Sequence, residues 1–271
     1  AAALEFIRRH RDRPFFLYYA NVLPHLALMV PDEDLRPYLE LGWDDPPYLG
    51  QKGYTPHRYP RAAYAAMISR LDADLGAIVE ELDRCGLSRE TVVIFSSDNG
   101  PTHDVGGVDT TFFNSTGGLR GRKGSLDEGG IRVPCIVRWP GRTPAGQTTD
   151  ALTGFEDWMP TLLDIAGAKP SADLDGVNLR PLLEGGAMPE RAYLYREFPG
   201  YGGWQAVWQG PWKAVRRDLL RRARRGEPPL TELYRLDQDP AESNNLAGAR
   251  PDVVARLEKI MAQAHTPSAD F

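Results

Sequence analysis

Two adjacent oxygen-bearing side chains, Asp98 and Asn99, directly follow a short apolar segment near the middle of the sequence. That segment, Thr91–Phe95, is β-branched and aromatic and predicts a buried strand. Ligands of open α/β sheets bind beyond the carboxyl ends of strands. Because hard carboxylate and amide oxygens suit Ca²⁺ or Mg²⁺, Asp98 and Asn99 are candidate metal ligands. The alternative is a polar turn closed by an Asx-type hydrogen bond.

A glycine-rich basic segment, residues 117–125, comes shortly afterwards and contains Arg120 and Lys123. Glycines let the backbone approach a ligand closely, and a lysine ammonium is a compact cation for an oxyanion. The residue order is not that of a Walker phosphate-binding loop. We expect Arg120 and Lys123 to bind the anionic group of a substrate, and Lys123 to take part in the reaction. The alternative is a solvated basic loop.

Two histidines are candidates for proton transfer, because imidazole titrates near neutral pH. His25 follows Pro24 just past the apolar segment Pro14–Ala20, and His103 comes soon after Asp98. Asp104 is a further candidate of the same kind. A structural role is the alternative for each of these residues.

The elements that must position these residues alternate between helix and strand. This alternation predicts an α/β sheet with a largely parallel core. We expect helices over Ala1–His10, Ala62–Leu82 and Phe155–Ala166, and strands over Pro14–Ala20, Thr91–Phe95 and Ile131–Trp139. The segment Pro31–Pro60 is rich in Pro, Gly and Tyr and is expected to be a long surface loop.

A second region is expected after a change in composition near residues 184–190. Its short strands, Ala192–Glu197, Gln205–Trp208, Trp212–Arg216 and Glu232–Arg235, precede an amphipathic helix that begins at Pro251. Strands followed by one helix indicate a small antiparallel sheet with a helical cover. We therefore expect an α/β core over residues 1–184 and an α+β subdomain over residues 185–271.

Composition excludes several classes of protein. The net charge of −5 disfavours a nucleic-acid partner, although a local basic pocket can still bind a small anion. No apolar run is long enough to cross a membrane, and no signal peptide is visible. Cys85 and Cys135 have neither disulfide-framework nor zinc-site spacing. One run of arginines is interpreted as a solvated hairpin loop: Arg216, Arg217, Arg221, Arg222, Arg224 and Arg225.

The order of these motifs resembles that of bacterial arylsulfatases, which belong to the alkaline-phosphatase superfamily. The matching segments are Ser97–Pro101, Phe112–Ser115, Leu119–Lys123, Glu128–Pro134 and Trp139–Gly141, and the strands after residue 200 are similar to the family's C-terminal subdomain. The resemblance implies that Asp98 and Asn99 are two ligands of a Ca²⁺ or Mg²⁺ ion. It also implies that Lys123 and His25 contact the sulfate, although Ala27 stands where the family usually has proline.

The sequence departs from the family at the nucleophile. Sulfatases oxidise a Cys or Ser in a C/S-x-P/A-S-R motif to formylglycine, and neither Cys85 nor Cys135 lies in such a motif. An early pair of metal-binding aspartates is also absent. We therefore expect a sulfatase-like fold that lacks its N-terminal strands and does not use formylglycine.

Three functional hypotheses remain open. The first is a metal-dependent hydrolase that attacks sulfate esters or activated phosphate di- or triesters with water, with a small anionic ester as substrate. The second is a non-catalytic binding or oligomerising remnant, since exposed sheet edges favour self-association and a homodimer. The third is half of an enzyme that is completed in trans. Family members are often exported, but the compartment of this chain is left open.

Overall fold

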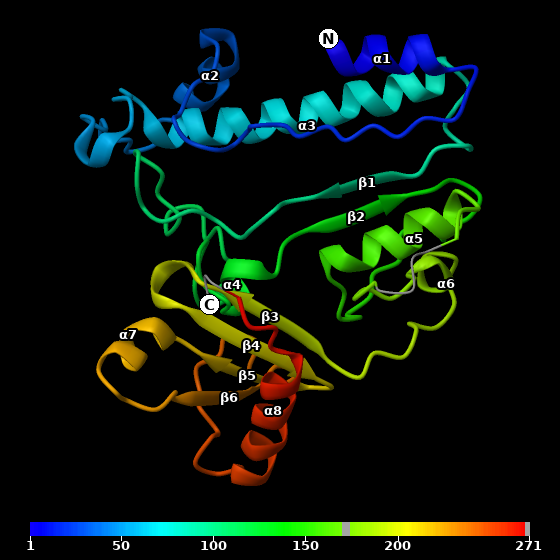
Figure 1. Ribbon diagram of the computed structural model, residues 1–271. Helices are drawn as coiled ribbons and strands as arrows, with labels where there is room; N and C mark the ends of the chain where they lie inside the picture. The colour runs from blue at the N-terminus through cyan, green and yellow to red at the C-terminus, as the bar shows by residue number, and fades with distance from the viewer. Residues whose placement is uncertain (170–173, 269–271) are drawn as a thin grey trace. The chain divides into compact units, whose positions relative to one another are not determined.

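A computed structural model describes residues 1–169 and 174–268, and its contacts divide the chain into two compact units (Figure 1). Unit 1 contains residues 1–93 and 102–115, and unit 2 contains residues 94–101 and 116–271. Among the described residues, no helix is both long and apolar enough to cross a membrane. The chain passes between the units three times, so each unit is built from discontinuous segments.

Unit 1 is organised around the long helix α3, Pro60–Arg84, which confirms the clearest helix predicted from the sequence. Proline at the first helical position fits the unpaired backbone N–H groups there. The carboxylate of Asp45 accepts the backbone N–H groups of Arg61 and Ala62, both at 2.9 Å, and so caps the helix. Helices α1, Ala2–His10, and α2, Asp32–Leu39, both pack against α3.

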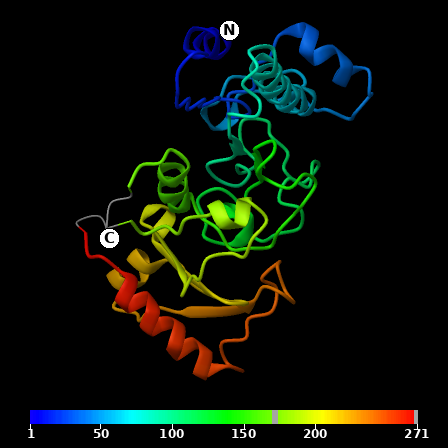
Figure 2. The same cartoon turned by 90° about the vertical axis from the view of Figure 1, so that its right-hand side faces the viewer.

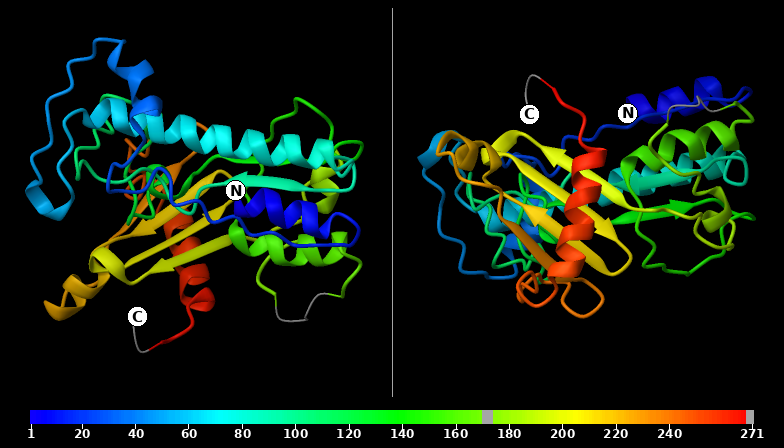
Figure 3. Two further views of the ribbon diagram at one scale, coloured as in Figure 1. Left: turned by 90° about the horizontal axis from the view of Figure 1, so that it is seen from above. Right: turned by 60° about the horizontal axis from the view of Figure 1, so that its bottom comes forward.

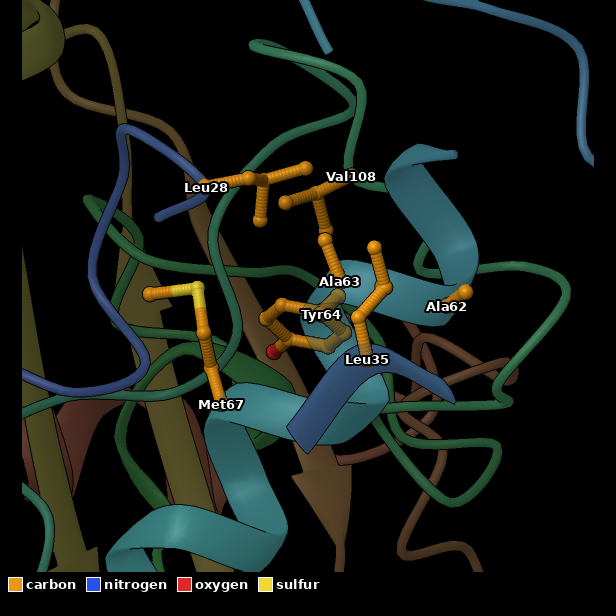
Figure 4. Packing of buried hydrophobic residues seen from close by; sticks show 7 residues of the cluster. All are labelled: Leu28, Leu35, Ala62, Ala63, Tyr64, Met67 and Val108. Carbon is orange, nitrogen blue, oxygen red and sulfur yellow. The ribbon is translucent and has the colours of Figure 1, made fainter. Parts of the chain in front are cut away.

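The core of unit 1 lies at the N-terminal end of α3 (Figure 4). Buried side chains from α2, α3 and two loop segments meet there: Leu28, Leu35, Ala62, Ala63, Tyr64, Met67 and Val108. At the other end of α3, Glu81 is 3% exposed. Its two carboxylate oxygens accept hydrogen bonds from Nε and Nη2 of Arg8 in α1, at 2.8 and 2.7 Å, and form a bidentate ion pair. The hydrogen bond from Arg8 lowers the pKa of Glu81 to about 2.

Two predictions about unit 1 were wrong. Pro14–Ala20 is not a buried strand; it forms no regular element, and Phe16 and Tyr18 are 73% and 82% exposed. The physical reason is that a strand needs neighbouring backbone partners, and the described residues provide none for this segment. The expected loop Pro31–Pro60 contains α2 and a short 3₁₀-helix, η1, Gln51–Gly53. Pro37 lies inside α2, so the backbone hydrogen bond that this residue would donate to the preceding turn is missing.

Unit 2 contains the strand that precedes Asp98. This strand is β1, Val93–Ser96, and its first residue is the last residue of unit 1. It pairs with β2, Cys135–Arg138, and the arrows of the two strands point in opposite directions (Figure 1). The largely parallel core that we expected is therefore absent from the described strands. Alternating helices and strands are also compatible with antiparallel neighbours, because hydrophobic periodicity does not encode strand direction. The short helices α4, Glu128–Ile131, α5, Trp158–Ile165, and α6, Arg180–Leu183, belong to the same unit, as does η2, Phe155–Asp157.

The antiparallel sheet predicted near the C-terminus is confirmed. Its strands, in the spatial order β3-β4-β5-β6, are Leu194–Phe198, Trp204–Gln209, Trp212–Arg216 and Thr231–Arg235. Helix α8, Pro251–Ala264, lies across one face of this sheet (Figures 2 and 3). A shorter helix, α7, Leu219–Arg224, lies between β5 and β6 in the chain.

Alternation along the strands explains why the sheet has two apolar faces. Ala206 and Trp208 contribute to one cluster, whereas Val207 between them packs on the other face. That second face also holds Ala214 and Leu233, and α8 covers it with Val253, Leu257 and Met261, one helical turn apart.

The contacts do not divide the chain at the expected boundary between residues 184 and 185. Residues 116–184 share unit 2 with the C-terminal sheet. Ion pairs cross the boundary, including Arg196 to Glu156 at 2.9 Å and Lys213 to Glu128 at 3.0 Å. The composition change near residue 185 marks a connecting loop, so a division there into folding modules stays a prediction.

Candidate functional site

The candidate metal ligands lie on the loop that leaves β1. Asp98 is exposed and Asn99 is half-buried. Asn99 donates its amide N–H to the carbonyl oxygen of Gly100 over 3.0 Å, and Ser97 donates its hydroxyl to the carbonyl oxygen of Asn99 over 2.9 Å. With Nδ2 of Asn99 engaged in this way, its Oδ1 is the atom oriented to accept a cation.

This loop approaches helix α4 more closely than any side chain at Gly100 would permit. The backbone N–H of Gly100 donates to the carbonyl oxygen of Gly130 over 2.8 Å. A Cβ atom built on Gly100 would lie 2.0 Å from the carbonyl oxygen of Gly129. Glycine at position 100 is therefore required for the contact between the two backbones.

Backbone hydrogen bonds bring the basic segment to the same place. Lys123 donates its backbone N–H to the carbonyl oxygen of Pro101 over 2.8 Å, and Gly129 donates to the carbonyl oxygen of Arg120 over 2.7 Å. Lys123 is half-buried. The segment of Asp98 and Asn99 is thus bonded to the segment of Lys123, and both are bonded to Gly129–Gly130, within unit 2. This arrangement places two hard oxygen donors and one ammonium group on a single connected loop cluster.

Arg120 points toward the C-terminal sheet. Its Nη1 donates to the hydroxyl of Tyr234 at 2.6 Å and to the backbone carbonyl of Glu242 at 3.2 Å. It also forms an ion pair with Glu232 at 3.4 Å. These contacts give Arg120 a structural role, and its expected role in binding substrate stays a prediction.

The two candidate histidines belong to unit 1. His25 places Nδ1 2.7 Å from the carbonyl oxygen of Leu26. The carbonyl oxygen of His103 accepts the backbone N–H of Val105 over 2.8 Å. Asp104 accepts both the backbone N–H and the hydroxyl of Thr110, at 2.9 and 2.7 Å. These contacts organise the loops that carry the three residues, and the proposed proton-transfer roles of the histidines stay predictions.

The donors available for a metal ion are few. In the described ranges, no three or more His, Cys, Asp or Glu side chains are grouped so that they could hold a metal ion. The chemistry of Asp98 and Asn99 fits Ca²⁺ or Mg²⁺ because both supply hard oxygens. Ca²⁺ takes about six to eight oxygen ligands, so these two residues are only part of a complete coordination shell.

Sequence reasoning missed a buried charged cluster behind the loop cluster. The ammonium of Lys213 is fully buried and lies 3.0 Å from Glu128 and 2.8 Å from Glu242. Glu242 also accepts the backbone N–H of Glu128 over 2.7 Å, and the indole of Trp208 donates to the Glu128 carboxylate over 3.0 Å. Burial raises the pKa of Glu242. The available sequence signal was a lysine inside an otherwise apolar strand.

Comparison with protein families gives two matches that together cover nearly the whole chain. Residues 1–168 match the sulfatase family model. Residues 122–266 match the model described as N-sulphoglucosamine sulphohydrolase, C-terminal. Human arylsulfatase A is 34% identical over 279 residues, which cover 93% of this chain and 49% of that protein. An N-acetylgalactosamine-6-O-sulfatase of Bacteroides thetaiotaomicron is 28% identical and covers 97% of this chain and 50% of its own length.

Solved structures confirm the expected fold. The crystal structure of Ps i-CgsB superimposes with a TM-score of 0.74 at 28% identity, and covers 98% of this chain and 55% of its own. The phosphonate monoester hydrolase of Agrobacterium radiobacter has the same fold, with a TM-score of 0.66 at 24% identity, over 96% of this chain and 59% of its own. The chain spans about half the length of the curated relatives it matches. With a family model matching more than half of its residues, this chain belongs to the sulfatase family.

Proposed function

We propose that this chain supplies metal-binding and anion-binding residues of a hydrolase for sulfate esters and activated phosphate di- and triesters. The observation that carries this proposal is the hydrogen-bonded loop cluster that joins the Asp98–Asn99 turn to Lys123. Sulfuryl and phosphoryl centres are both tetrahedral, and their non-bridging oxygens carry negative charge in the ester or develop it during attack by water. The same pair of metal-binding oxygens and one ammonium group therefore suits either substrate.

The proposed roles follow from the chemistry of each side chain. Asp98 and Asn99 would hold Ca²⁺ or Mg²⁺, which polarises an ester oxygen and makes water a better nucleophile. Lys123 binds a non-bridging oxygen and stabilises the charge that develops on it. His25 and His103 of unit 1 stay candidates for proton transfer to the leaving group, because imidazole titrates near neutral pH. Neither Cys85 nor Cys135 stands in a formylglycine motif, so the proposed nucleophile is water.

The test combines metal binding with turnover. Calorimetry with Ca²⁺ and Mg²⁺ measures binding directly, and release of 4-nitrophenol from its sulfate and from bis(4-nitrophenyl) phosphate measures hydrolysis. We expect EDTA-sensitive turnover that Asp98→Ala and Lys123→Met abolish, whereas the matched variants Asp12→Ala and Lys259→Met leave it unchanged. Turnover that resists EDTA, or that survives Asp98→Ala, would refute the proposal.

A specific observation favours a second candidate function, in which the chain assembles with another polypeptide. In unit 1, Phe16, Tyr18 and Val22 are 73%, 82% and 72% exposed along one extended segment. In unit 2, Ile136 of strand β2 is 61% exposed. Apolar and aromatic side chains this exposed are typical of surfaces that another chain covers.

We propose two occupants for these surfaces, a second copy in a two-fold dimer and an N-terminal half supplied in trans. Light scattering across a concentration series distinguishes a dimer from a monomer. Co-expression with the N-terminal half of a sulfatase relative tests the second occupant, with restored arylsulfatase activity as the expected result. A concentration-independent monomer that gains no activity on co-expression would exclude both.

A further inference from the structure

An exposed aromatic residue, Tyr201, lies in the turn between β3 and β4. Tyr201 is 60% exposed and lies in the short 3₁₀-helix η3, Gly200–Gly202. Its φ is +52°, a conformation that non-glycine residues rarely adopt. Backbone strain of this kind persists where the surrounding structure enforces it, and it is concentrated at functional sites.

The ring of Tyr201 lies directly on the backbone of the residue after Lys123. A Cβ atom built on Gly124 would lie 2.6 Å from Cε2 of Tyr201 and 2.9 Å from Cζ. Only glycine at position 124 leaves room for the ring, and Gly124 also has a positive φ of +88°. Both residues belong to unit 2. Because the ring of Tyr201 lies on Gly124, it is next to the backbone of Lys123, the candidate anion-binding residue.

The ring of Tyr201 has an aromatic neighbour, and an arginine lies near the next residue in the chain. The ring of Phe198 lies 6.0 Å away, centroid to centroid, and supports Tyr201 from β3. At the next residue, a Cβ atom built on Gly202 would lie 2.7 Å from the Asp218 carboxylate and 3.5 Å from Nε of Arg221. Arg221 is 64% exposed on its side chain and pairs with Asp218 at 3.1 Å. Exposed pairs of this kind are weak, so the guanidinium can exchange Asp218 for an anionic ligand.

We propose that Tyr201 is the platform on which the organic part of the substrate stacks, so that this site selects esters of ring-bearing alcohols over acyclic ones. The proposal rests on the proposed function, because the anionic group is placed at Lys123. A ring that carries a sulfate or phosphate ester lies across the Tyr201 face while its charged group reaches the loop cluster. Arg221 adds a second cation at the edge of this surface.

The experiment compares three ligands by calorimetry in the presence of Ca²⁺: inorganic sulfate, methyl sulfate and phenyl sulfate. We expect phenyl sulfate to bind more tightly than methyl sulfate. Tyr201→Ala and Tyr201→Leu should weaken phenyl sulfate about five- to tenfold, the effect of losing one stacked ring contact, and leave inorganic sulfate unchanged. Tyr201→Phe should retain the preference. The matched control Tyr193→Ala removes another exposed tyrosine of unit 2 and should change none of the affinities.

Each unfavourable outcome has a distinct meaning. If phenyl and methyl sulfate bind equally to the unchanged chain, the ring platform is refuted while the proposed function stands. If Tyr201→Ala weakens inorganic sulfate as much as phenyl sulfate, Tyr201 supports the loop and does not contact the ligand, which also refutes the platform. If the unchanged chain binds no sulfate at all, the proposed function fails and this inference fails with it.

Discussion

Removing the buried ammonium of Lys213 is the sharpest test of how unit 2 is held together. Lys213 and Glu242 are fully buried and Glu128 is 7% exposed on its side chain. Lys213→Met keeps most of the side-chain volume but removes the cation that pairs with buried Glu242, and it leaves Glu128 with the longer ion pair to Arg132 at 3.9 Å. Removing one partner of a buried ion pair costs about 3–5 kcal/mol, and we expect the free energy of unfolding to fall by that amount.

Glu242→Gln is the matched comparison. Burial raises the pKa of Glu242, so a neutral amide removes a charge that is costly to bury, while Lys213 keeps its ion pair with Glu128. The amide oxygen can still accept the backbone N–H of Glu128. We therefore expect this variant to lose about 1 kcal/mol or less, the value of an ordinary neutral hydrogen bond.

The assay is chemical denaturation followed by tryptophan fluorescence, since Trp208 donates its indole N–H to Glu128 and reports on the cluster. Arg225→Met is the control, because its pair with Glu227 lies on the surface and its loss should leave the transition unchanged. Equal losses for Lys213→Met and Glu242→Gln would refute the reasoning, as would a Lys213→Met variant as stable as the unchanged chain.

Three further predictions concern single residues. Gly100→Ala forces Cβ against the carbonyl oxygen of Gly129, so calorimetry should show weakened Ca²⁺ binding. Leu257→Ala opens a cavity under the sheet and should cost about 2–5 kcal/mol in denaturant unfolding. The hydrogen bond from Arg8 lowers the pKa of Glu81 from its ordinary 4.5 to about 2. The ionised Glu81 carboxylate therefore stabilises the fold fully at pH values well above 4.5, and this stabilisation is lost as the pH falls toward 2. Glu81→Gln should therefore flatten that acid limb in pH-dependent thermal melts, whereas an unchanged limb would contradict the assignment.

Local patterns were sufficient for elements whose partners are near in sequence. The short strands expected over Gln205–Trp208 and Trp212–Arg216 follow each other closely in the sequence, and they pair as a hairpin. The three- and four-residue spacing in α3 is equally local. Pro14–Ala20 has the composition of a buried strand, but a strand also requires partners elsewhere in the chain, and composition carries no information about them.

The same distinction applies to the candidate site. Asp98, Asn99 and Lys123 were identified because they lie within one short stretch with recognisable motif order. Lys213 and Glu242 were missed because they reach Glu128 across 85 and 114 positions. A lysine within an apolar strand indicates that a buried partner exists, but the identity of that partner emerges only from the folded chain. The sequence did not single out Tyr201, because its proposed role depends on the contact of its ring with Gly124, which only the folded chain shows.

The discontinuous composition of unit 2 has a consequence for biosynthesis. Residues 94–101 leave the ribosome early, yet their neighbour Gly130 and the supporting Lys213 and Glu242 follow much later. At about 5–20 residues per second, translation from Asp98 to Glu242 takes on the order of 10–30 s. During that interval the turn carrying Asp98 and Asn99 gains its bond to Gly130 but lacks the buried cluster of Glu128, Lys213 and Glu242 behind it. We therefore expect the proposed metal-binding turn to become fully supported only after Glu242 has been made.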